Sequence, residues 1–319
     1  MKAGAAILPR DGVAAASGAA GETRGLLLGF LGIAGFSLTL PMTRVAVAEI
    51  DPIVVGLGRS LISVFLAAGL LAWRRDPFPG RRYVPGLLVI ALGVIVGFPV
   101  FSALALRRVP AAHGAVVAGL LPLATALCAT IRAHERPSRG FWLAAVAGSA
   151  TVVGFMVVEN GARLVRADVF LLLAVATCGV GYAEGGRLSR ELGGWRVLSW
   201  ALVLAAPFLT VPVGMSIAAH GLHASPAAWG ALAYMGIVSM FLAFWAWYHA
   251  LAIGGVARVS QVQLVQPFLS LAAARFLLGE RVAEQDVLLE DVIGVGRSHG
   301  AALKLGIQEG ARRPQQTQL

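Results

Sequence analysis

Two glutamines precede a proline inside a long apolar run of this sequence. Gln263 and Gln266 lie three residues apart, so a helix would carry both on one face, together with Ser260. An amide at membrane depth is costly unless it faces a partner or water. The pair could therefore join two helices by hydrogen bonds or bind a polar substrate. We interpret Gln263 and Gln266 as candidate substrate-binding residues.

Further polar and aromatic side chains within apolar runs are candidates for the same site: Tyr182, Glu184, Trp245, Trp247, His113 and Thr125. All but Tyr182 have a structural alternative. Glu184 and His113 could lie at the membrane interface, and Thr125 could hydrogen-bond to its own helix. The two tryptophans could belong to an interfacial aromatic belt. Turned inward, they would form an apolar wall or a cation–π platform for the substrate.

Two prolines and one arginine are predicted to lie inside membrane helices. Pro122 and Pro267 would each remove one helix hydrogen bond, which makes them packing kinks, or else hinges or exposed backbone acceptors that face a cavity. Arg59 lies about 10 Å into the second apolar run by helix rise. For Arg59 we expect a structural role, paired with a carbonyl or a loop acid, rather than contact with a substrate, and snorkelling is a further alternative.

Catalytic patterns are missing from the sequence. No Ser–His–Asp grouping and no phosphate-binding loop is visible, and Cys128 and Cys178 lack metal-ligand spacing. The sequence therefore predicts that the protein is not an enzyme and that it holds no metal and no cofactor.

The composition places these residues in a membrane. The chain is 58% hydrophobic and only 13% charged, against about 25% charged in soluble domains. Its apolar runs are continuous, which favours helices over barrel strands. We predict an all-α integral membrane protein of about ten transmembrane helices, with spans near 25–46, 52–73, 84–106, 110–131, 140–158, 167–186, 197–219, 226–249, 255–278 and 285–306.

An internal repeat organises these spans. Pro122 and Pro267 lie 145 residues apart, as do Glu135 and Glu280, which we interpret as structural residues at helix ends. Five spans per unit is an odd number, so the second unit would be inverted and the substrate site would lie near the midplane. The expected domains are a disordered cytosolic tail (1–23), two five-helix repeats (24–158 and 164–306) and a second cytosolic tail (307–319).

The last span departs from the repeat. From about residue 286 the sequence is atypical, and Glu290 and Asp291 fall where the first unit has apolar residues. An acid at a helix centre costs about 2.5–3.5 kcal/mol on insertion scales. Either the tenth helix is lost, or it lies on the membrane surface, or the C-terminal sequence has been altered, for example by a reading-frame shift.

The basic residues indicate the orientation. The net charge is +10, and Lys and Arg concentrate in the loops on the same side as the N-terminus. The positive-inside bias explains this charge without nucleic acid and places both termini in the cytoplasm, with the protein in the inner membrane.

These features together resemble the EamA-type members of the drug/metabolite transporter superfamily. The resemblance rests on two five-span units, on Arg59 in the second span, and on the paired signatures Pro122…Glu135-Arg136 and Pro267…Gly279-Glu280-Arg281. It covers about residues 25–285 and departs at the tenth span. It implies a transporter of small metabolites or drugs, often an exporter of amino acids or related compounds.

We therefore expect a secondary transporter that moves a small molecule by alternating access. An uncoupled facilitator and a non-transporting membrane scaffold or sensor remain as alternatives. The expected partners are a small-molecule substrate and the lipid bilayer, but no nucleic acid, and the protein could form a homodimer.

Overall fold

The computed structural model describes residues 19–132, 139–160 and 165–279, and every regular element within these ranges is a helix. The first half of the chain forms α1 (Ala19–Ser37), α2 (Thr39–Val47), α3 (Pro52–Arg74), η3 (Arg81–Tyr83), α4 (Val84–Ile90), η4 (Ala91–Gly97), α5 (Phe98–Leu106), α6 (Ala111–Ala118), α7 (Leu121–Arg132) and α8 (Arg139–Asn160). The second half forms α9 (Arg166–Leu192), α10 (Gly194–His220), α11 (Pro226–Tyr234), η5 (Met235–Ala243), α12 (Phe244–Gly254), α13 (Val256–Val259), η6 (Ser260–Val265) and α14 (Gln266–Leu278). Several predictions fall outside the described residues: those for Glu135, Glu280, the tenth helix, the C-terminal tail and most of the N-terminal tail.

Seven segments of the described chain are long and apolar enough to cross a membrane: Thr23–Val47, Pro52–Arg74, Arg81–Leu106, Ala111–Arg132, Arg166–Leu192, Gly194–His220 and Pro226–Gly254. Each coincides with a span expected from the sequence. Two further expected spans coincide with α8 and with the run from α13 to α14. The protein is therefore an all-helical membrane protein.

The fourth expected span is divided into two helices, and the ninth changes helix type along its length. α6 ends at Ala118, and α7 begins at Leu121, so that Pro122 falls in its first turn. In the ninth span, Pro267 is the second residue of α14, which follows the 3₁₀ segment η6. The prediction of a proline that interrupts a continuous helix is wrong in both spans. First-turn N–H groups have no partner within their own helix, so a proline there loses no hydrogen bond.

Irregular helix segments recur at the spacing of the repeat. η4 and η5 are both π-helical. Adding 145 to the residues of η4 gives 236–242, which lie inside η5. The same addition carries α3 to 197–219, inside α10. The two halves of the chain therefore place similar irregularities at equivalent positions.

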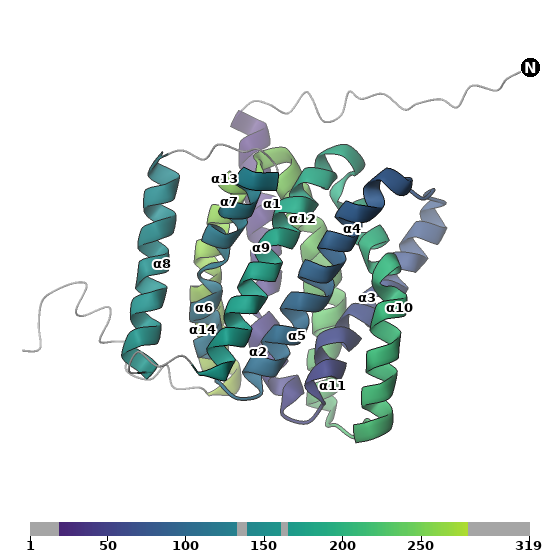
Figure 1. Ribbon diagram of the computed structural model, residues 1–319, viewed down its shortest axis with the longest axis vertical. Helices are drawn as coiled ribbons and strands as arrows, with labels where there is room; N and C mark the ends of the chain where they lie inside the picture. The colour runs from purple at the N-terminus through teal and green to yellow at the C-terminus, as the bar shows by residue number, and fades with distance from the viewer. Residues whose placement is uncertain (1–18, 133–138, 161–164, 280–319) are drawn as a thin grey trace, which may run out of the picture. The chain divides into compact units, whose positions relative to one another are not determined.

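Helix α9 packs against α7, α5, η4, α10, α12 and α4, and Figure 1 shows it in the midst of these helices, while α8 lies beside α6 and α7. Glycines allow its closest approach to η4. A Cβ on Gly93 would lie 2.5 Å from the carbonyl oxygen of Thr177, and one on Gly181 would clash with Val94. Such small residues let membrane helices pack backbone to backbone.

Polar contacts at both ends hold α3 antiparallel to α10. At the start of α3, Asp51 is the N-cap residue, and the Ser216 hydroxyl donates to its carboxylate at 2.7 Å. Beyond the end of α3, Asp76 pairs with Arg196 at 2.8 Å, near the start of α10. The two helices thus run alongside each other over their whole length.

Candidate functional site

Four aromatic rings from three helices form a buried cluster. Phe36 of α1, Tyr182 of α9, and Phe244 and Trp247 of α12 make up this aromatic cluster, in which the Phe36 and Phe244 ring centroids lie 4.7 Å apart and those of Tyr182 and Trp247 lie 5.5 Å apart. The side chain of Trp247 is fully buried, yet its indole N–H has no hydrogen-bond partner among the described residues. Trp245 is instead 42% exposed, as the aromatic-belt interpretation requires.

Arg59 of α3 is buried within electrostatic reach of Tyr182, and only 2% of its surface is exposed. Its Nη1 lies 3.8 Å from the thioether sulfur of Met235, and its guanidinium carbon lies 5.9 Å from the centroid of the Phe98 ring. The Nε group has no partner in the described part of the chain. Among the described residues, Arg59 thus contacts a sulfur and a ring rather than the predicted carbonyl or loop acid.

The serines beside Arg59 bind the two π-helical segments. The Ser60 hydroxyl donates to the Ile95 carbonyl of η4 at 2.9 Å, and the Ser63 hydroxyl donates to the Gly236 carbonyl of η5 at 2.7 Å. The two hydroxyls thus tie α3 to both π-helical segments. Arg59 thus lies where α3 joins both irregular segments.

The glutamines expected to bind substrate are buried. In η6 and at the start of α14, every third residue is buried, namely Ser260, Gln263 and Gln266, which is the periodicity of a 3₁₀ helix. Both polar atoms of the Gln263 side chain, and Oε1 of Gln266, have no hydrogen-bond partner among the described residues. A role in joining helices would require such a bond, and the structure provides none for Gln263.

Thr125 lies near these glutamines on a neighbouring element. Its helix, α7, packs against η6. The Thr125 side chain is fully buried, and its hydroxyl has no partner within the described ranges, so it does not bond back to its own helix. Thr125 therefore adds another unpaired polar atom at membrane depth.

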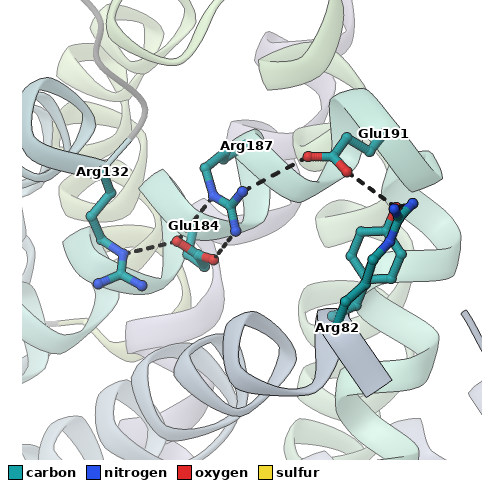
Figure 2. Close-up of polar contacts among 6 residues, drawn as sticks. Arg82, Arg132, Glu184, Arg187 and Glu191 are labelled. Carbon is teal, nitrogen blue, oxygen red and sulfur yellow. Dashed lines mark hydrogen bonds and ion pairs between the residues drawn. The ribbon is translucent and has the colours of Figure 1, made fainter. Parts of the chain in front are cut away.

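Glu184 is held by two arginines, as Figure 2 shows. Its carboxylate lies 2.8 Å from Nε of Arg132 and 2.6 Å from Nη2 of Arg187, and its side chain is 2% exposed. Arg187 also lies 3.8 Å from Glu191. The chain of contacts continues because Glu191 accepts a hydrogen bond from Tyr83, which in turn contacts Arg82. Both oxygens of Glu184 are occupied by these ion pairs, so the structure does not leave it open to a substrate.

His113 has a partner that the sequence analysis missed. Its Nε2 lies 2.7 Å from Oδ1 of Asp168, and the two side chains are 4% and 0% exposed. The other Asp168 oxygen accepts a hydrogen bond from the N–H of Val165 at the start of α9. The signal in the sequence was an acid in the first turn of an expected helix, a favoured position for a carboxylate. His113 and Asp168 thus form a buried side-chain pair.

The structure brings some of the predicted residues together and separates others. Tyr182 and Trp247 meet in the aromatic cluster, and η6 packs against α1 and α7, which carry Phe36 and Thr125. A Cβ on Gly29 of α1 would lie 3.0 Å from Val259 and 3.8 Å from Trp247. Since η6 begins directly after Val259, the glutamine segment starts beside the cluster, whereas Trp245 and Glu184 have other surroundings.

Comparison with known proteins explains this arrangement of helices. The EamA-like transporter family matches the sequence twice, over residues 23–157 and 165–293. The chain belongs to this family. An uncharacterized transporter of Bacillus subtilis (strain 168), YdeK, is 43% identical over 268 residues, which cover 82% of this chain and 91% of that protein. The resemblance noted in the sequence is thereby confirmed, and this EamA-family protein is a multi-pass membrane transporter.

A solved structure described only as "Crystal structure of protein" has a similar fold. It matches with a TM-score of 0.62 and 19% sequence identity, over 85% of this chain and 95% of that chain. At this identity the likeness concerns the fold alone. The family and the relative's name indicate transport rather than catalysis.

Proposed function

We propose that the protein is a secondary transporter that moves a small metabolite or drug-like molecule across the inner membrane by alternating access. Compounds related to amino acids and the export direction are the first candidates. The observation that carries this proposal is a group of buried polar atoms that have no partner among the described residues: Arg59 Nε, Trp247 Nε1, Thr125 Oγ1, Gln266 Oε1 and both polar atoms of Gln263. Ser189 Oγ and Ser199 Oγ are two further such atoms. A buried polar group without a hydrogen bond costs about 1–3 kcal/mol by protein mutational data. A substrate that binds to these atoms would recover that cost.

The proposed architecture is a pair of inverted five-helix units, 24–158 and 164–306. Three packing relations support it. α3 packs against its repeat equivalent α10, α1 packs against α12, and α9 packs against α5. The last two contacts are equivalent under the repeat. Adding 145 to the residue numbers carries α1 onto α9 and α5 onto α12. An interface of this kind between inverted units is where such transporters bind their substrates.

The proposed orientation follows the basic residues. Asp76 and Arg196 bring the end of α3 and the start of α10 to one end of the helices, where Arg74, Arg75, Arg81 and Arg82 also lie. Arg132, at the end of α7, joins this end through Glu184. By the positive-inside rule we assign this end, and both termini, to the cytoplasm.

An uncoupled facilitator and a non-transporting scaffold or sensor are the competing functions. A scaffold should use its buried polar side chains for hydrogen bonds between packed helices. The Gln263 side chain makes no such bond to any described residue, which argues against the scaffold.

A metabolite screen tests the proposal. Intracellular and extracellular pools are compared in cells that lack the protein, cells that produce it, and cells that produce Trp247→Phe, which removes the unpaired indole N–H. Trp245→Phe is the matched control because Trp245 is exposed. We expect a small set of related compounds to move between the pools, with an altered rate in Trp247→Phe only. Identical pools in all strains would favour the scaffold.

A further inference from the structure

Arg59 carries a positive charge that the structure leaves without a counter-ion. Its side chain is 2% exposed, and no carboxylate among the described residues lies within ion-pairing distance of it. Its neighbours are the Met235 sulfur, the Phe98 ring and the side chains of Cys178 and Tyr182, which are close enough to interact with its charge. Buried charges in proteins are normally paired or bound to a ligand.

The surroundings of Arg59 come from both halves of the chain. α3 and α5 carry Arg59 and Phe98, whereas α9 and η5 carry Tyr182 and Met235. A group bound to this guanidinium would therefore contact the elements that must separate and rejoin in alternating access. Tyr182 also belongs to the aromatic cluster, so the charge and an apolar surface adjoin.

The other buried charged residues indicate which charge the ligand carries. Among the described residues the buried carboxylates are Asp168, which pairs with His113, and Glu184, which pairs with two arginines. Neither is free to receive an ammonium group. The site thus offers one unneutralised positive charge and no free negative charge.

We infer that Arg59 is the anion-binding residue of the transport site and that the substrate is a monocarboxylate with an apolar body. The carboxylate binds the planar guanidinium, whose parallel N–H groups match its two oxygens. The apolar body lies against the aromatic cluster. This inference rests on the proposed transport function, and it names the substrate class of that same site.

The test uses the full chain in lipid nanodiscs and measures the melting temperature against probe concentration. The probes are hexanoate and phenylacetate, each compared with its own primary amide, which keeps the shape and removes the charge. The midpoint is the probe concentration that gives half of the maximal rise in melting temperature. For each carboxylate it should be about tenfold or more below that of the amide, because a hydrogen-bonded charge pair replaces a neutral contact.

Four variants separate charge recognition from a structural role. In Arg59→Gln the carboxylate and amide midpoints should converge to within about twofold, and in Arg59→Lys part of the preference should return. Arg275→Gln is the matched control, because Arg275 also lies in a membrane helix but is exposed, and it should keep the full preference. Arg59→Met removes an unpaired charge, so its melting temperature without ligand should equal or exceed that of the wild type.

Several results would overturn the inference. These are a wild-type response that is absent or equal for acid and amide, a preference that survives Arg59→Gln, or a lower ligand-free melting temperature in Arg59→Met. Flux in proteoliposomes judges the transport function separately. Flux of a neutral or cationic compound that Arg59→Gln leaves unchanged would refute the anion site and keep the transporter. Carboxylate binding without any flux would keep the anion site and refute transport.

Discussion

A substitution at Gln263 can distinguish substrate binding from a role in joining helices. Its amide is 1% exposed and has no hydrogen-bond partner among the described residues. Gln263→Ala should therefore leave the melting temperature unchanged while it removes a substrate hydrogen bond worth roughly 0.5–1.5 kcal/mol. That loss weakens apparent affinity about two- to tenfold.

The control for this substitution is Gln261→Ala, in the same segment but exposed. It should change neither melting temperature nor affinity. A lower melting temperature with unchanged affinity in Gln263→Ala would instead identify Gln263 as a residue that joins helices.

Asp51 offers a prediction on pH at the residue scale. Burial alone would raise the pKa of Asp51, but hydrogen bonds from Ser216 and the Ile53 N–H, together with nearby His220, hold it below its ordinary value of 3.8. A carboxylate with a lowered pKa stabilises the fold above its unfolded pKa and loses that contribution as pH falls through the folded value. Asp51→Asn keeps the helix cap, because Asn is also a good N-cap residue.

The measurement is the melting temperature of wild type and Asp51→Asn between pH 6 and pH 3. The wild type should be the more stable protein at pH 6, and the two should converge toward pH 3. A difference that stays constant over this range would show that the charge of Asp51 does not stabilise the fold.

Burial of the site residues could be predicted from the sequence better than their partners. Gln263, Thr125 and Trp247 could be identified because each places a polar group inside an apolar run, where that group is costly unless it has a partner. The partners were harder to predict, since they come from distant segments. Arg59 was expected to pair with a carbonyl or an acid, and Asp168 was not recognised as the partner of His113, because only the fold brings α6 to the start of α9.

At the scale of elements, Glu184 fastens α9 to the end of α7. Glu184→Gln would keep the shape and remove the charge that holds Arg132 and Arg187. Hydrogen bonds to charged groups are worth about 1.5–3 kcal/mol. Since the two arginines are 40% and 38% exposed, water compensates in part, and we expect a loss of about 1–2 kcal/mol.

Glu191→Gln is the matched control in the same helix. Glu191 is 48% exposed, and its ion pair with Arg187 spans 3.8 Å, so the loss should stay below about 0.5 kcal/mol. Equilibrium unfolding in detergent compares the two. Equal losses in both variants would contradict a fastening role for Glu184.

The discontinuous helices show where sequence patterns lose precision. The sequence predicts that Pro122 and Pro267 interrupt helices. Their spacing of 145 residues indicates the repeat. The regular α-helix begins just before each proline, after Gly119-Leu120 in the fourth span and after the 3₁₀ segment η6 in the ninth. Proline fits a first turn without loss, so a pattern that marks a break cannot by itself tell a kink from a new start.

At the scale of the whole molecule, the helical membrane class and most span positions could be predicted, because hydropathy depends on local composition alone. The repeat was visible from one spacing. The π-helical segments η4 and η5 were not predicted, since their geometry depends on packing and on hydroxyls such as those of Ser60 and Ser63. The tenth span, where sequence and repeat disagree, lies outside the described residues.

The inverted arrangement can be tested with single cysteines at 78 and 222, in a background with Cys128→Ala and Cys178→Ala. Under the repeat spacing of 145, position 222 corresponds to 77, so a parallel repeat would place both sites on one side of the membrane. In the structure Phe78 packs against Trp200 near the start of α10, with ring centroids 5.2 Å apart, whereas Leu222 follows the end of that helix. A helix of 27 residues spans about 40 Å, enough to cross a bilayer.

Both side chains are accessible, at 42% and 41% exposure for Phe78 and Leu222. A membrane-impermeant maleimide applied to intact cells should therefore label position 222 at once and position 78 only after permeabilisation. The basic residues near position 78 set this direction, because arginine-rich loops stay in the cytoplasm. Labelling of position 78 alone in intact cells would reverse the orientation but keep the inverted repeat. Labelling of both positions from one side would exclude the inverted repeat, because α10 would then not separate the two positions across the membrane.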